Sequence, residues 1–207
     1  MSLFVKLCGL RTPADVETAI EVGASAVGFV LTPSSRQIPL SYAARLNRML
    51  PASVLGVAVL NNPAPDLIER ALAEVAPDLL QVEYRRGSGL PADTLLPVVV
   101  NGDGLEEAVT MALRGTERGM VLVDTAAKGG TGRKSDWGRI AALAERDRVI
   151  VAGGLNPGNV GEAISLIHPH GVDVSSGIEA RPGEKDPGLM RAFVEAARSA
   201  ELRGARL

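Results

Sequence analysis

The 207-residue sequence contains one cysteine and two histidines, and only 3% of its residues are aromatic. A lone cysteine, Cys8, excludes an internal disulfide, and together with His168 and His170 it makes a poor set of metal ligands. The scarcity of aromatic rings argues against a stacking surface for nucleic-acid bases. We therefore expect no structural metal and no recognition of single-stranded nucleic acid.

The sequence also lacks an excess of one charge and lacks a long apolar run. Its 22 Lys and Arg residues nearly balance 24 Asp and Glu residues, and the charges are scattered, which disfavours nucleic-acid and anionic membrane partners. No stretch has the 18 or more apolar residues that a membrane span needs, and Lys6 interrupts the apolar N-terminus. These features predict a cytoplasmic protein.

What the sequence does contain is enough apolar material for one full core. Hydrophobic residues make up 46% of the chain, and no low-complexity linker or charge block divides it. We therefore expect a single catalytic domain over residues 1–207.

Short apolar runs alternate with stretches of helical period along the whole sequence. About eight runs are predicted to be strands: Leu3–Cys8, Ser25–Leu31, Val54–Leu60, Asp78–Glu83, Leu95–Val100, Gly119–Asp124, Arg148–Gly153 and Gly171–Ser176. Because most of these runs are continuous Val, Ile and Leu, they are typical of a parallel sheet that helices cover.

The helices are predicted between the strands, several of them after start signals such as Thr12-Pro13, Ser41, Asp103, Asn156-Pro157 and Asp186-Pro187. The predicted helices are Ala14–Val22, Tyr42–Leu50, Asp66–Val75, Gly104–Leu113, Trp137–Glu145, Gly158–Ile167 and Gly188–Ala200.

About eight such units favour a (β/α)₈ barrel of the TIM type. The fourth crossover, Tyr84–Thr94, contains two glycines and a proline, so we expect its helix to be degenerate. An open doubly wound sheet is the alternative, but it usually has a phosphate loop after its first strand, where this chain has CGLRTP.

In a (β/α)₈ barrel the active site lies at the carboxyl ends of the strands. Cys8, Glu83, Asp124 and Asp173 lie at or near such ends, and Arg36 lies in the loop after the second strand. A cysteine here is either a buried hydrophobe or a base whose pKa a positive neighbour lowers. Asp124 is either a turn carboxylate or an acid that faces this base across the barrel mouth.

Two late glycine-containing loops predict a phosphate site. Gly153 and Gly154 follow the seventh strand, and Ser176 and Gly177 follow the eighth, which is the recurrent phosphate position of this fold. The alternative is that these glycines only form tight turns. The long basic loop Thr125–Trp137 is typical of a mobile lid, and it fails the P-loop pattern because Arg133 stands before Lys134-Ser135.

Four segments together resemble one family. KLCGLRTPADVETAIEVGASAVGFVLTPSSRQI, VDTAAKGGTGRKSDW, VAGGLNPGNV and DVSSGIEARPGEKD are similar, in this order and over nearly the whole chain, to phosphoribosylanthranilate isomerases of tryptophan biosynthesis. The resemblance implies a barrel that converts N-(5'-phosphoribosyl)anthranilate to 1-(2-carboxyphenylamino)-1-deoxyribulose 5-phosphate by an Amadori rearrangement. It implies no metal or organic cofactor.

The resemblance also implies roles for individual residues. Cys8 corresponds to the general base of the family and Asp124 to its general acid. Arg36 corresponds to the arginine that faces the anthranilate group, and Asp173 to the aspartate of the DVSSG motif. The only expected partner is a small phosphorylated substrate, and the composition fits a monomer or a homodimer.

One position departs from the family pattern. Where the fourth strand usually ends Gln-Leu-His-Gly, this chain has Gln81-Val82-Glu83-Tyr84. Glu83 places a negative charge near the expected position of the substrate carboxylate. This leaves two alternatives: a relative that isomerises another aminoaldose phosphate, and a phosphate-ligand binding barrel without catalysis.

Overall fold

Eight parallel strands form a closed barrel in the order of the chain. The computed structural model describes residues 2–83, 92–100, 102–125 and 137–204. Within these ranges the barrel consists of β1 (Phe4–Cys8), β2 (Ala26–Val30), β3 (Leu55–Leu60), β4 (Leu79–Glu83), β5 (Leu95–Val100), β6 (Val121–Asp124), β7 (Val149–Ala152) and β8 (Gly171–Val174). β8 pairs with β1 and closes the ring, so the predicted (β/α)₈ barrel is confirmed.

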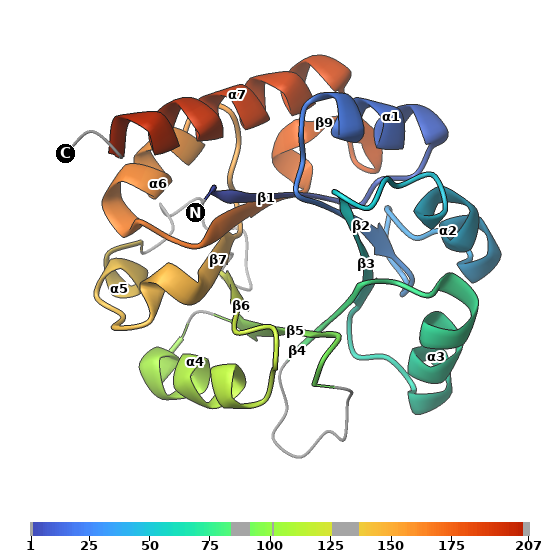
Figure 1. The fold of residues 1–207 in the computed structure, drawn as a ribbon, viewed down its shortest axis with the longest axis horizontal. Helices are drawn as coiled ribbons and strands as arrows, with labels where there is room; N and C mark the ends of the chain where they lie inside the picture. The colour runs from blue at the N-terminus through green and yellow to red at the C-terminus, as the bar shows by residue number, and fades with distance from the viewer. Residues whose placement is uncertain (1, 84–91, 101, 126–136, 205–207) are drawn as a thin grey trace.

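The helices lie outside the ring of strands, as Figure 1 shows. Those in the described residues are α1 (Pro13–Glu21), α2 (Leu40–Asn47), α3 (Pro65–Arg70), α4 (Leu105–Arg114), α5 (Trp137–Ala141), α6 (Val160–Ile167) and α7 (Pro187–Gly204). None of these described helices is both long enough and apolar enough to cross a membrane. Between β4 and β5, residues 92–94 form a turn, and the rest of the predicted degenerate crossover, 84–91, lies outside the described residues.

Two of the predicted helix starts are confirmed by their hydrogen bonds. The Thr12 hydroxyl accepts from the Asp15 N–H, and the Asp15 carboxylate accepts in return from the Thr12 N–H, which is a capping box. The Asp186 carboxylate accepts from the Leu189 N–H at 2.9 Å and caps α7 in the same way.

Three other starts are wrong by one or two residues. α2 begins at Leu40, directly after Pro39, without a side-chain cap from Ser41. Gly104, whose φ is +71°, precedes α4 in place of Asp103. α6 begins at Val160 because the chain first forms a turn in which the Asn156 carboxamide oxygen accepts from the Gly158 N–H.

The third predicted helix ends at Val75 as expected but changes its type, and the fifth is shorter than expected. After Arg70 the third helix widens into a π-helical turn, Ala71–Val75, and it ends where the Asn47 amide donates to the carbonyls of Val75 and Ala76. α5 stops at Ala141, and a 3₁₀ turn, Arg146–Arg148, leads into β7.

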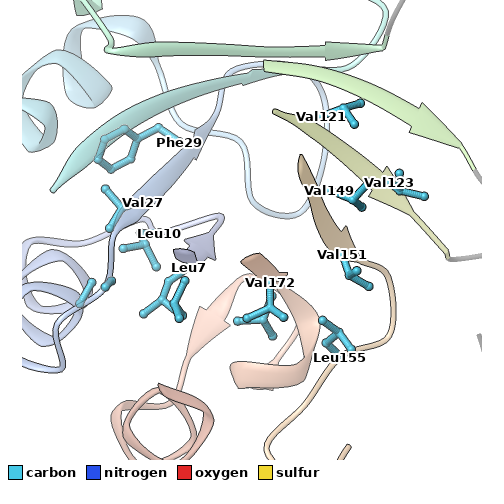
Figure 2. Packing of buried hydrophobic residues seen from close by; sticks show 14 of the residues in the cluster. Leu7, Leu10, Val27, Phe29, Val121, Val123, Val149, Val151, Leu155 and Val172 are labelled. Atoms are coloured by element: carbon cyan, nitrogen blue, oxygen red, sulfur yellow. The ribbon is translucent and has the colours of Figure 1, made fainter. Parts of the chain in front are cut away.

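The core has two layers because successive residues of a strand point to opposite faces. The outer layer fills the space between strands and helices, and Figure 2 shows its members from β1, β2, β6, β7 and β8: Leu7, Val27, Phe29, Val121, Val123, Val149, Val151 and Val172. The inner layer fills the barrel with Ala26, Val57, Leu79, Leu96, Leu122 and Ile150. Cys8 belongs to this inner layer, and so its side chain points into the barrel.

A small antiparallel hairpin that the sequence analysis missed follows β8. Its strands are β9 (Glu179–Arg181) and β10 (Glu184–Lys185), and it leads directly into α7. The hairpin matters because it carries two buried charged side chains, Glu179 and Lys185, to the carboxyl end of the barrel.

Candidate active site

A cavity of about 520 Å³ opens at the carboxyl ends of the strands. Its wall contains six of the predicted site residues: Arg36, Asp124, Gly153, Gly154, Asp173 and Ser176. Glu83 also lines it. Cys8 and Gly177 are not part of the wall; Cys8 is buried inside the barrel, and Gly177 packs against the backbone at Leu155. The structure thus gathers the predicted residues at one end of the barrel.

Cys8 lies beside a buried ion pair. Lys6 is two residues earlier on β1 and therefore on the same inner face, and its Nζ lies 2.6 Å from Oδ1 of Asp173 on β8. The Lys6 side chain is 0% exposed, and its positive charge acts on the Cys8 thiol. A cation, an anion and a thiol therefore share the space beneath the cavity.

Burial and charge together determine the protonation of Lys6 and Cys8. Burial lowers the pKa of Lys6, but the interactions with Asp173 and Cys8 together outweigh burial and leave this pKa above its ordinary value. Burial raises the pKa of the Cys8 thiol, and the charge of Lys6 offsets only part of that rise. The expected positive neighbour is thus present, but burial has the larger effect, and Cys8 is a thiol at neutral pH.

Arg36 is held across the cavity mouth by Glu179. Its Nε and Nη2 donate to the two carboxylate oxygens of Glu179 at 2.6 and 2.8 Å, the bidentate geometry that fixes a guanidinium group. Lys185 Nζ donates to Glu179 Oε1 at 2.8 Å and to the Ser175 carbonyl at 2.9 Å. One carboxylate therefore serves two cations, and this cluster carries a net positive charge.

The two predicted phosphate loops pack against each other. Gly153 and Gly154 both have positive φ, 93° and 68°, which glycine adopts without strain. A Cβ on Gly177 would lie 1.9 Å from the Leu155 carbonyl oxygen, so only glycine fits at this contact. The Gly177 position is therefore a packing requirement that holds the loop after β8 against the loop after β7.

The opposite wall of the cavity is more apolar. Val98, Val100 and Leu122 from β5 and β6 line it beside Gln81 and Glu83 of β4. Val100 is 42% exposed although it ends a barrel strand. The Oε1 of Gln81 is buried without a hydrogen-bond partner in the part of the chain that the structure describes. This wall offers an apolar surface with one unused acceptor.

Sequence reasoning missed four of these residues: Lys6, Gln81, Glu179 and Lys185. The signal for Lys6 was present, because a lysine inside a predicted buried strand needs a partner. Glu179 and Lys185 gave no comparable signal, since they stand in a segment of mixed polarity. The predicted lid is not tested, because its residues 126–136 lie outside the described ranges.

The histidines lie away from the cavity. His168 is the left-handed residue that ends α6, and the ring of His170 stacks on Phe4 with centroids 5.9 Å apart. Burial lowers the pKa of His170. Among the residues that the structure describes, no cluster of three His, Cys, Asp or Glu side chains has a geometry that would hold a metal ion.

The fold and the cavity define a (β/α)₈-barrel enzyme with charged side chains at the carboxyl ends of its strands. The particular family follows from comparison with known proteins. The family model for N-(5'-phosphoribosyl)anthranilate isomerase matches residues 5–196, so the chain belongs to this family of tryptophan-biosynthesis isomerases.

Relatives and solved structures agree over nearly full length. The chain is 36% identical to the N-(5'-phosphoribosyl)anthranilate isomerase of Chelativorans sp., covering 97% of this chain and 98% of that protein. It resembles monomers made from the dimeric isomerase of Thermotoga maritima, with a TM-score of 0.75, 31% identity and coverage of 95% and 98%. It also resembles an isomerase in complex with reduced 1-(o-carboxyphenylamino)-1-deoxyribulose 5-phosphate, with a TM-score of 0.76, 32% identity and coverage of 95% and 99%.

The Glu179 cluster predicts a loss of stability in acid. Burial raises the pKa of Glu179, but hydrogen bonds from Arg36 and Lys185 outweigh burial and leave it below its ordinary value. The depressed pKa means that the stabilisation is complete above pH 4.5 and disappears as the pH falls through the folded-state value. We expect Glu179→Gln to lower the free energy of unfolding at pH 7 by about 1–3 kcal/mol, measured by urea titration.

The difference between wild type and Glu179→Gln should narrow as the pH falls from 5 to 3, because the wild-type carboxylate is then protonated. Glu184→Gln is the matched control, since the exposed Glu184 pairs only with Arg181 in the same hairpin. A stability difference that stays constant over this pH range would contradict the assignment.

Proposed function

We propose that residues 1–207 form one catalytic domain in which Cys8 is the general base and Asp124 the general acid for the isomerisation of N-(5'-phosphoribosyl)anthranilate. The observation that supports this assignment is the placement of both groups at the carboxyl end of the barrel. Asp124 lines the cavity, and Cys8 lies beneath it in contact with the Lys6–Asp173 pair. An acid and a base that approach one cavity from different strands suit proton transfers at two sites of one substrate.

The reaction begins with a proton from Asp124. This proton goes to the oxygen of the ribose ring, the C1–O bond breaks, and the lone pair of the aryl nitrogen forms an iminium ion. The positive nitrogen makes the hydrogen on C2 acidic. The Cys8 thiolate then takes that proton, and the electrons of the C–H bond form an enolamine that tautomerises to the ketone. Electrons and protons balance without a redox partner.

The raised pKa of Cys8 fits this sequence of events. A thiolate of high pKa is a strong base, but it is scarce at neutral pH. The iminium ion formed in the first step brings a positive charge into the cavity, which favours the thiolate when the proton on C2 must be removed. The Cys8 thiolate is therefore favoured at the step in which a strong base is needed.

The two ends of the substrate have separate binding regions in this proposal. Gly153, Gly154, Ser176 and Gly177 hold the phosphate at the loops after β7 and β8. Arg36 binds the carboxylate on the aryl ring, and Asp173 contacts the sugar. The relative solved with a reduced product analogue supports this division, because that ligand carries a phosphate at one end and a carboxyphenylamino group at the other. Binding energy at the two ends fixes the reacting carbons between acid and base.

Glu83 is the residue that supports an alternative substrate. It lines the cavity at the end of β4, where its charge repels a carboxylate. An aminoaldose phosphate without an aryl carboxylate is therefore the alternative substrate. The structure of the dimeric Thermotoga relative supports a homodimer as one assembly state, with the monomer as the other.

Replacing the base should abolish turnover without abolishing binding. We expect Cys8→Ser to lower kcat by at least about a hundredfold, because general-base catalysis is worth this much. Freshly generated phosphoribosylanthranilate is followed by the loss of its fluorescence, and affinity for a product analogue is measured separately. Normal turnover by Cys8→Ser would remove the assigned base, and binding without turnover by the wild type would favour a binding barrel.

The acid has its own test. Asp124→Asn cannot donate the proton that opens the ring, so we expect a fall in kcat of about a hundredfold or more. Single-turnover fluorescence separates ring opening from later steps. A variant that opens the ring at the wild-type rate would refute the role of Asp124.

The arginine should act on binding. Arg36→Ala removes the guanidinium group at the cavity mouth, so we expect KM to rise about tenfold or more, as loss of a charged hydrogen bond predicts, with a smaller change in kcat. Arg181→Ala is the control, because Arg181 lies in the hairpin that carries Glu179 and forms an exposed ion pair with Glu184. An unchanged KM for Arg36→Ala would show that another residue holds the carboxylate.

A further inference from the structure

We propose that Lys6 is a positioning residue that makes the base available: its ammonium group, held by Asp173, stabilises the thiolate of Cys8 inside the barrel. The inference rests on the proposed role of Cys8 as base. It adds a residue to which neither the fold nor the proposed mechanism assigns a function.

The position of Lys6 is the first observation. The inner layer of the barrel is apolar at the corresponding depth on other strands, with Val57, Leu79 and Ile150, but β1 places a fully buried lysine there. Burying an ammonium group costs several kcal/mol unless it is paired. A neutral side chain of similar length would avoid this cost, so a structural role alone gives no reason for the charge.

The partners of Lys6 are the second observation. Lys6 and Asp173 are register neighbours on β1 and β8, and their charged atoms are 2.6 Å apart. Asp173 supplies the counter-charge of the lysine, and Cys8 is the next inward-facing residue of the same strand. Because Lys6 and Cys8 lie on the same face two residues apart, the strand itself holds them together.

Among the charged groups near Cys8, the Lys6–Asp173 pair has the largest effect on the ionisation of the thiol. Four charged groups act on the thiol: Lys6, Asp173, Lys185 and Arg36. Lys185 and Arg36 are both bound to Glu179, and Lys185 has a smaller effect on the thiol than Lys6 has. Lys6 is the cation with the largest effect, and Asp173 is the anion that opposes it. The two partners therefore act on Cys8 with opposite signs.

The proton stays on Lys6 throughout the reaction. The Cys8 thiol loses its proton to solvent to give the thiolate, and the thiolate then takes the proton from C2 of the substrate. The ammonium group stabilises the charged form of the sulfur and donates no proton. Lys6 thus acts through Cys8 and does not react with the substrate.

The test reads the ionisation of Cys8 directly. Cys8 is the only cysteine of the sequence, so the rate of its alkylation by iodoacetamide, followed by mass spectrometry from pH 6 to 11, reports one thiol. The midpoint of this profile reports the ionisation of Cys8. Differences in how easily the reagent reaches the thiol change the alkylation rate at the high-pH plateau and leave the midpoint unchanged. We expect Lys6→Met to move the midpoint upward by about one pH unit or more and to slow alkylation at pH 7 about tenfold.

We expect Asp173→Asn to move the midpoint downward, because the Cys8 thiolate then becomes the counter-ion of Lys6. Lys6→Arg should restore most of the wild-type midpoint. Arg70→Met is the matched control, because it removes one positive charge from an exposed pair with Glu74 and should leave the midpoint unchanged. A purely structural ion pair would make Lys6→Met and Asp173→Asn move in the same direction, and that result, or no movement, would overturn the proposal.

A double variant covers the case in which Lys6→Met fails to fold. Removing both partners of a buried pair is tolerated better than removing one, so Lys6→Met/Asp173→Asn is compared with Asp173→Asn. The proposal requires a higher midpoint in the double variant, and equal midpoints would refute it. The two proposals fail in different experiments. Normal turnover by Cys8→Ser would refute the role of Cys8 as base, whereas unchanged alkylation midpoints would refute the effect of Lys6 on Cys8.

Discussion

The two-residue alternation of side chains in a closed barrel is the constraint on which the rest of this structure depends. It sends Leu7 outward to the helices and Lys6 and Cys8 inward, and it does the same on every strand. Because all strands are parallel, their inward residues at the carboxyl ends meet in one cavity. The arrangement of the candidate site follows from this geometry, since no long loop is needed to bring Cys8 near Asp173 or to place Asp124 on the wall.

The buried charged side chains of this barrel form two groups. Lys6 and Asp173 form a neutral pair within the barrel, while Arg36, Lys185 and Glu179 form a positive cluster at its mouth. The neutral pair tolerates burial, and the positive cluster suits a substrate with two anionic ends. Glu83 also lines the cavity, from the end of β4.

The alternation explains what could be predicted from the sequence. Eight continuous apolar runs indicated the strands to within about two residues at most of their ends, and the residues after them indicated the cavity. Thr12 and Asp186 were recognised as caps because their side chains bond to the backbone locally. The start of α6 was placed too early, because the turn at Asn156 depends on contacts with Asn159 and Gly158 that no periodicity encodes.

The site was predictable where one residue type dictates its chemistry, and it was not where the role depends on a distant partner. The positions of Cys8, Asp124 and Arg36 at one end of the barrel were predicted from strand ends and from family motifs, and their roles are proposals. Glu179 was missed because its importance comes from Arg36, 143 residues away in the sequence, and from a hairpin without a strong strand pattern. Lys185 was missed for the same reason.

The contact between Lys6 and Asp173 has a consequence for the order of folding. The two residues are 167 positions apart and lie on the first and last strands of the barrel. Contacts at such separation form only after the chain has paid a large loop-closure entropy. Without the β1–β8 pairing, Lys6 lacks the counter-ion that the closed barrel gives it. The proposed chemistry of Cys8 therefore requires the closed ring, in which the two ends of the sheet have met.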